Sequence, residues 1–64
     1  PEIHEVKVTS MEDYVTKLKQ INDELKSIPL FVRSGETIEI ISANKVEEIN
    51  KNDVIAYLGK KLDI

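Results

Sequence analysis

The stretch of residues 10–28, SMEDYVTKLKQINDELKSI, decides the fold that we predict for this chain. Its apolar residues recur at spacings of three and four, which places them on one stripe of an amphipathic helix. They are Met11, Tyr14, Val15, Leu18, Ile21, Leu25 and Ile28. We expect Leu18 and Ile21, in the middle of the stripe, to be the most buried residues of this helix.

Both ends of the predicted helix are marked in the sequence. Ser10 is a good N-cap, because its hydroxyl can accept a hydrogen bond from the amide of Asp13, whose short carboxylate imperfectly completes a capping box. Pro29 stands at the other end, and a helix usually ends at or before the residue that precedes a proline. The predicted helix therefore fills residues 10–28.

Length and composition limit the kind of protein. The chain has 64 residues, and we expect one small domain, 1–64, near the lower size limit for folding without a metal or a disulfide. It has no cysteine, which excludes disulfides, thiolate zinc sites and thiol catalysis. The formal net charge of −3, with scattered basic residues, argues against a strong phosphate-binding surface.

Nothing in the sequence predicts a membrane or an export signal. No apolar run approaches the roughly 18 residues that a spanning helix requires, and the first residues do not combine a basic segment with an apolar one. We expect neither a transmembrane span nor a signal peptide. A cytoplasmic location is the expectation, because small secreted domains often carry disulfides.

The segment before the helix, EIHEVKVT at residues 2–9, has the pattern of a strand. Val6 and Val8 alternate with polar residues, as in a half-buried strand. His4 shares the valine face if the strand is straight. A catalytic base or a pH switch is one interpretation of His4, and a partly exposed histidine with no task is the alternative that we favour, because no reactive partner stands nearby in the sequence.

The segment after the helix, PLFVRSGETIEIIS at residues 29–42, predicts a β-hairpin of strands 30–33 and 37–41. We expect Ser34-Gly35-Glu36 to form a three-residue loop. That loop pairs Arg33 with Thr37 and Val32 with Ile38. One face of the hairpin, turned toward the helix, then has Leu30, Val32, Ile38 and Ile40, and the other has Phe31, Arg33, Thr37, Glu39 and Ile41.

Two further elements complete the prediction. Residues 42–51, SANKVEEINK, suit either a short edge strand or a helical turn, and we favour the strand. Residues 52–64, NDVIAYLGKKLDI, predict a second helix, with Asn52 or Asp53 as its cap. Its buried stripe is formed by Val54, Ile55, Leu58 and Leu62, with Tyr57 at the edge and Gly59 as a weak point.

No set of residues in the sequence predicts an enzyme. The two glycines stand outside any phosphate-binding motif, and there is no zinc-binding helix motif, serine elbow or histidine pair. The glutamates at 36, 39, 47 and 48 could hold a divalent cation or imitate phosphates, but a solvated edge is the interpretation that we favour. We expect no catalytic residue, no cofactor and no metal.

Two families offer a resemblance. The run VKVTSMEDY, followed by IPLFVRSGETIEIIS, loosely resembles the Phd/YefM antitoxin domain. That resemblance implies a dimer that binds operator DNA and neutralises a toxin. The expected order of one helix, three strands and one helix resembles a double-stranded-RNA-binding domain, although Asn52 and Asp53 stand where that family has a lysine cluster.

These observations predict an α+β domain in the order β-α-β-β-(β)-α, with two helices on one face of a small antiparallel or mixed sheet. We expect a non-enzymatic regulatory module that binds another protein, with a homodimer as one form. The alternatives are a DNA-binding regulator of antitoxin type, which would need Lys7, Arg33 or the Lys60–Lys61 pair on one face, and an acidic decoy for a nucleic-acid site. The expected partner-binding residues are Phe31, Arg33, Glu39 and Ile41, around a diagonal contact of Phe31 with Ile41.

Overall fold

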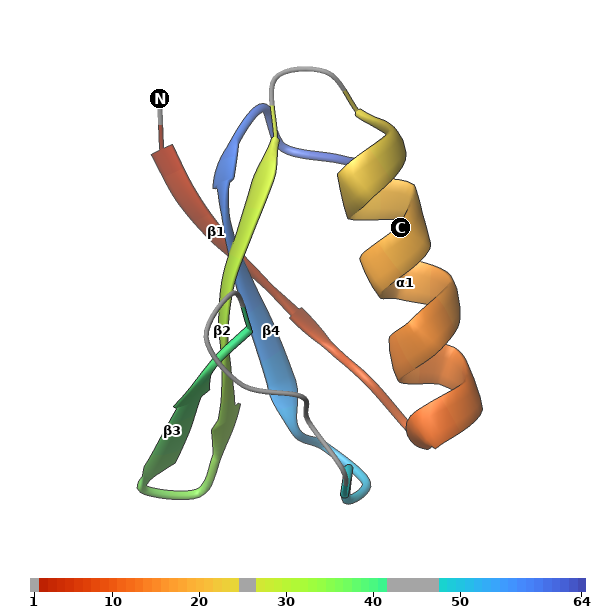
Figure 1. Ribbon diagram of the computed structural model, residues 1–64, viewed down its shortest axis with the longest axis vertical. Coiled ribbons are helices and arrows are strands. Elements are labelled where there is room, and N and C mark those ends of the chain that lie inside the picture. Colours follow the sequence, from red (N-terminus) through yellow and green to blue (C-terminus); the bar gives the residue numbers. More distant parts are fainter. Residues whose placement is uncertain (1, 25–26, 42–47) are drawn as a thin grey trace.

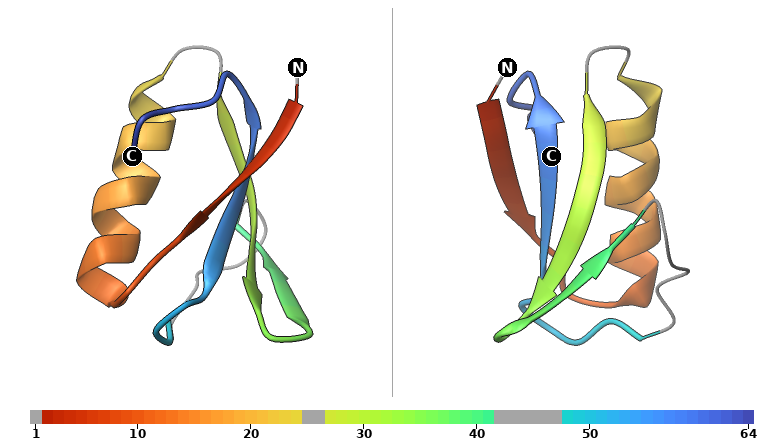
Figure 2. Two further views of the ribbon diagram at one scale, coloured as in Figure 1. Left: turned by 180° about the vertical axis from the view of Figure 1, so that it is seen from behind. Right: turned by 60° about the vertical axis from the view of Figure 1, so that its left-hand side comes forward.

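The computed structural model describes residues 2–24, 27–41 and 48–64, and it is of the α+β class. One helix, α1 (Met11–Asp23), packs against one four-stranded antiparallel sheet. The strands are β1 (Glu2–Lys7), β2 (Ile28–Ser34), β3 (Thr37–Ile40) and β4 (Val54–Gly59). Their order across the sheet is β1-β4-β2-β3, with α1 behind the sheet in the right-hand view of Figure 2.

The segment predicted as a second helix is instead β4, so that prediction was wrong. The five residues VIAYL are apolar without interruption, which is the pattern of a short strand buried on both sides. The residues predicted as a helix cap form the turn into β4. Asn52 has a left-handed backbone with a φ of 74°, and the carboxylate of Asp53 accepts from the amide of Asn50 at 2.8 Å.

The strand β4 lies in the middle of the sheet, between the first and second strands of the chain (Figure 1). It pairs with β1 from Lys7↔Val54 to Glu2↔Gly59, and with β2 from Arg33↔Val54 to Ile28↔Leu58. The predicted order with a closing helix therefore does not hold, and neither does the order that resembled an RNA-binding domain. Most of the possible strand at 42–51 lies outside the described residues.

The helix begins where the sequence predicted and ends earlier. Ser10 is the N-cap, and its hydroxyl accepts from the amide of Asp13 at 3.2 Å. The last helical residue is Asp23, and Ile28 already belongs to β2. This agrees with the preference of a residue before proline for an extended backbone. Leu25, which we placed on the buried stripe, lies outside the described residues.

The hairpin forms, but its register differs from the prediction by one residue. Ser34 pairs with Thr37 and Arg33 with Ile38, so the loop has only two residues, Gly35 and Glu36. Gly35 has a φ of 61°, which suits the first position of a tight hairpin turn. Because side chains alternate along a strand, this shift moves Ile38 and Ile40 to the face turned away from the helix.

The core lies between α1 and the sheet. Its buried members are Val8, Tyr14, Ile21, Val32, Ile55 and Tyr57. Leu18 is only partly buried, so the most buried residues of the helix are Ile21, as predicted, and Tyr14. Leu62 and Ile64, in the segment after β4, pack against the same cluster. This segment turns back toward α1 in the left-hand view of Figure 2.

The carboxylate of Asp13 fixes the start of the helix. It accepts from the amide of Thr9 at 2.9 Å and from the ammonium group of Lys17 at 3.0 Å. These two interactions hold the pKa of Asp13 below its ordinary value of 3.8, and the hydrogen bond from the Thr9 amide has the larger effect. The ionised form therefore stabilises the folded chain at neutral pH.

We therefore predict a pH-dependent effect of Asp13→Asn. At neutral pH the variant should have a lower free energy of unfolding than the parent. Since the folded-state pKa is the lower one, the advantage of the parent should be complete above pH 3.8 and should shrink as the pH falls below that value. Urea unfolding of both chains at a series of pH values measures the difference. A difference that stays constant through the acid range would contradict this role of Asp13.

Candidate functional site

The face of the sheet turned away from α1, here called the outer face, is the most distinctive surface of the molecule. No described helix or strand lies in front of it in the right-hand view of Figure 2. Strand pairing arranges its side chains in three rows across the sheet. The rows are Ile3, Leu58 and Ile28; Glu5, Ala56, Phe31 and Ile40; and Lys7, Val54, Arg33 and Ile38.

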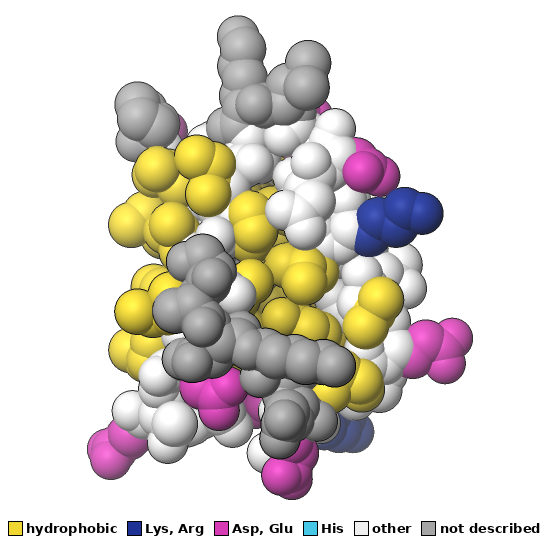
Figure 3. Space-filling view, viewed as in Figure 1, with side chains coloured by type: hydrophobic (Ala, Val, Ile, Leu, Met, Phe, Trp, Pro, Cys, Tyr) yellow, Lys and Arg dark blue, Asp and Glu magenta, His cyan; other side chains and the backbone are white. Residues whose placement is uncertain are grey.

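The outer face exposes an unusual amount of apolar surface. Ile3, Ile28, Ile38 and Ile40 each keep between 52% and 62% of their surface exposed. Phe31 and Leu58 are half-buried between them. In Figure 3, hydrophobic side chains gather along the left flank, the side of the sheet away from α1. Contiguous apolar patches of this kind are typical of interaction surfaces, whereas single exposed apolar residues need no explanation.

The centre of the outer face is closed even though no other described element covers it. Ala56 is fully buried and Val54 is 7% exposed, because β4 lies between two neighbouring strands whose side chains reach over it. Arg33 on β2 and Glu5 on β1 form an ion pair across β4, with 3.5 Å between the guanidinium and the carboxylate. Both side chains are well exposed, so the pair contributes little to stability, about 0–1 kcal/mol. It neutralises two of the three charges on this face.

The structure separates the four predicted partner-binding residues into two pairs. Phe31 and Arg33 lie on the outer face, Phe31 beside Ile40 in the same row. Glu39 pairs with the core residue Val32 and so lies on the helix side. Ile41 packs against the core. The predicted diagonal contact of Phe31 with Ile41 therefore does not form, because the register of the hairpin differs by one residue.

Tyr14 and His4 are two ring side chains on the helix side of the sheet. Tyr14 is buried at 5% exposure, and burial, followed by the negative charge of Glu39, raises the pKa of its hydroxyl. Tyr14 therefore stays neutral at physiological pH. His4 shares the valine face of β1, as predicted, and its ring lies 5.6 Å from that of Tyr57 at an angle of 41°. This arrangement is a tilted aromatic pair in the wall of the core.

Other chemistries find little support in the described residues. Among residues 2–24, 27–41 and 48–64, no three His, Asp or Glu side chains lie close enough to hold a metal ion. Lys7 and Arg33 share one row of the outer face, while Lys60 and Lys61 follow the end of β4. In this described part of the chain, α1 is too short to cross a membrane.

Comparisons with known proteins do not assign the chain to a family. No protein-family model matches it, and neither curated proteins nor solved structures give a significant match. The function of the chain is therefore inferred from the geometry of its sheet.

Proposed function

We propose that this chain is a non-enzymatic interaction module that binds another protein through its outer face. The observation that carries the proposal is the set of four exposed isoleucines on one side of a single sheet. A half-exposed isoleucine that a partner covers contributes about 1 kcal/mol, since full burial of such a side chain is worth about 1.5–3 kcal/mol. Phe31 and Arg33 remain in the proposed surface, while Glu39 and Ile41 lie outside it.

The chemistry of the partner follows from the face. It must offer an apolar surface of low charge, because the Glu5–Arg33 pair leaves Lys7 as the only charge without a partner among the described residues of this face. A regulatory role fits a module with a binding surface and no proposed chemistry of its own. The absence of cysteine from the whole sequence supports a cytoplasmic setting for this binding.

A homodimer is the second candidate, and one row of the outer face favours it. In that row the bulky Phe31 stands next to the fully buried Ala56. If two copies met face to face with their strands aligned, Phe31 and the exposed Ile40 beside it could cover the apolar residues of the other copy. Sheet-on-sheet packing of this kind joins two layers about 10 Å apart.

Affinity capture from the native host tests the proposal with one variant and a matched control. Ile40→Lys places a charge in the middle row of the outer face, on the edge strand β3. Val15→Lys places the same charge on α1, at an apolar residue that is 56% exposed, against 52% for Ile40. We expect the parent and Val15→Lys to capture the same host protein. That protein should bind Ile40→Lys at least about tenfold more weakly.

The composition of the captured material separates the two candidates. Recovery of the untagged chain itself indicates a homodimer, and recovery of a different protein indicates a separate partner. Equal recovery by Ile40→Lys and Val15→Lys would contradict a binding role for the outer face.

A further inference from the structure

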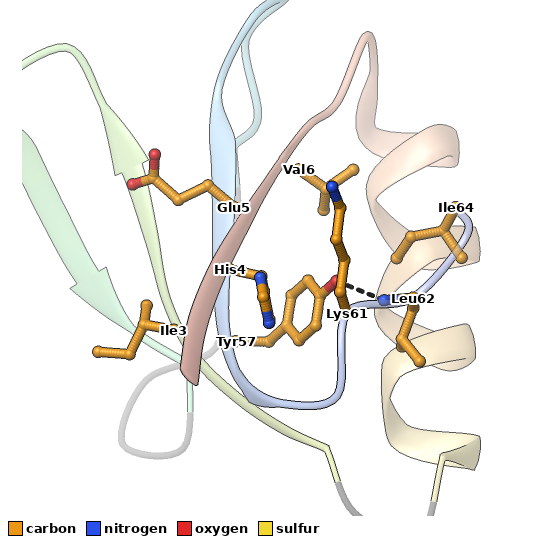
Figure 4. A pocket seen from close by; sticks show the side chains of 8 residues that line it. All are labelled: Ile3, His4, Glu5, Val6, Tyr57, Lys61, Leu62 and Ile64. Carbon is orange, nitrogen blue, oxygen red and sulfur yellow. Dashed lines mark hydrogen bonds between the residues drawn. The ribbon is translucent and has the colours of Figure 1, made fainter. Parts of the chain in front are cut away.

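A hollow of about 460 Å³ lies beside β1. Four consecutive residues of β1 line it, from Ile3 to Val6. Successive side chains of a strand point to opposite faces, so one strand cannot turn all four into the same hollow. The hollow must therefore run along the free backbone edge of β1. Tyr57, Lys61, Leu62 and Ile64 complete its lining (Figure 4).

The hydrogen bonds at the end of β1 show which backbone groups face this edge. The amide of Val8 donates to the carbonyl of Asp53 at 2.8 Å, and its carbonyl accepts from Asn52 at 2.9 Å, so Val8 faces the side of β4. Backbone direction alternates along a strand, so Ile3, Glu5 and Lys7 direct their N–H and C=O groups to the open edge. The carbonyl of Lys7 accepts a hydrogen bond from the ammonium group of Lys17 at 2.8 Å, which agrees with a carbonyl that points away from β4.

Ile3 and Glu5 therefore present two donors and two acceptors to the hollow. β1 is an edge strand, so no strand of the described part pairs with them. An open edge of this kind is a template for a further strand, unless charge or cover protects it.

The other wall of the hollow is the segment 60–64. The amide of Leu62 donates to the hydroxyl of Tyr57 at 3.0 Å, and the hydroxyl of Ser27 donates to the carbonyl of Lys60 at 3.5 Å. Leu62 and Ile64 also pack against the core. These contacts hold the segment at a distance from β1 and keep the groove between them open.

We propose that this groove binds an extended segment of a partner protein, which adds to β1 as an antiparallel strand. Strand addition of this kind gains affinity from main-chain hydrogen bonds and specificity from the alternate side chains. Ile3 and Glu5 also belong to the outer face, but this proposal depends on a different observation, the open backbone edge of β1. The occupant would pair with Glu5 and Ile3 through its backbone, and its side chains would meet both faces of β1.

The lining of the groove defines the sequence of the occupant. The side chain opposite Glu5 should be basic, because cross-strand pairs of opposite charge are favourable. The next one, opposite His4, points to the helix side toward the apolar wall and should be apolar, as should the one opposite Ile3. The residue opposite Val6 should be acidic, because Lys61 extends along the hollow toward Val6 (Figure 4). The expected order is acidic, basic, apolar, apolar.

Titration of the isotope-labelled full chain with the blocked peptide Ser-Glu-Arg-Val-Val-Ser tests this proposal. We expect the NMR signals of the Ile3 and Glu5 amides to shift on binding, together with those of Leu62. The matched test is methylation of single peptide nitrogens. A methyl on the arginine nitrogen, which faces β1, should weaken binding about tenfold through loss of a hydrogen bond. A methyl on the first valine nitrogen, which faces away, should change binding less than about twofold, since that nitrogen makes no bond to β1.

A charge exchange tests the register of the added strand. Glu5→Lys should weaken binding of the arginine peptide and strengthen binding of the peptide that has glutamate in place of arginine. Three results would each overturn the proposal. They are the absence of NMR shifts at β1, equal effects of the two methyl groups on binding, and an affinity that does not change with the charge at residue 5. Dimerisation of the parent would also overturn the proposal if Glu5→Pro abolished it and Glu5→Ala preserved it. The occupant of the groove would then be a second copy of β1.

Discussion

Replacement of Ile55 by alanine is expected to lower the free energy of unfolding by about 2–5 kcal/mol. Ile55 is fully buried on the central strand β4, opposite Val6 on one neighbouring strand and Val32 on the other. A domain of this size lies at the low end of the usual stability range of about 5–15 kcal/mol. The variant should therefore be largely unfolded at room temperature, which circular dichroism and urea titration will measure.

Ile38→Ala is the control for this prediction. It removes the same atoms from a residue that is 55% exposed, and surface changes usually stay within about 0.5 kcal/mol. Similar losses in the two variants would mean that β4 is not the centre of the core.

Tyr57→Ala is the second large effect that we expect, at about 3–5 kcal/mol, the range for a buried aromatic residue. The side chain of Tyr57 is 2% exposed, lies beside His4, and holds the segment after β4 through Leu62. Tyr57→Phe removes only the hydroxyl and its hydrogen bond, so it should cost about 1 kcal/mol. Thermal unfolding of both variants distinguishes the two contributions. A phenylalanine variant as unstable as the alanine variant would show that the hydroxyl, rather than the ring, maintains the structure.

The position of β4 explains why the sequence predicted one helix too many. Val54, Ile55 and Leu58 have a spacing that also fits a helical stripe, and Asn52 and Asp53 resemble a cap. The continuous apolar run of VIAYL is the better signal, because a central strand buries both faces at once. A helix of that stretch would have left half of its apolar side chains in water. Long-range pairing with β1 and β2, which no local pattern reveals, decided between the two structures.

The candidate surface was predicted in part because strand periodicity is strict. The alternation of β2 placed Phe31 and Arg33 together on the face away from α1, and the structure agrees. The alternation of β3 was assigned to the wrong faces, because a loop of two residues instead of three reverses every side chain. Ile38 and Ile40 were therefore missed. The preference of glycine for the first position of a two-residue turn could have identified the correct register at Gly35.

The helix was the most predictable element. Its apolar spacing, its serine cap and the proline after it are local signals. The serine cap gave the correct start, and the apolar spacing gave the buried Ile21. The end was set by pairing of Ile28 with Leu58 in the sheet, a contact between residues distant in the chain.

The outer face should be a surface of the folded monomer that is available for binding, and the stability of Ile40→Lys measures whether it is. Urea unfolding of the dilute variant should give a free energy of unfolding within about 0.5 kcal/mol of the parent, because the lysine meets solvent at a position that is 52% exposed. A loss as large as that of Ile55→Ala would contradict the account, since the outer face would then be covered within the monomer and closed to any partner.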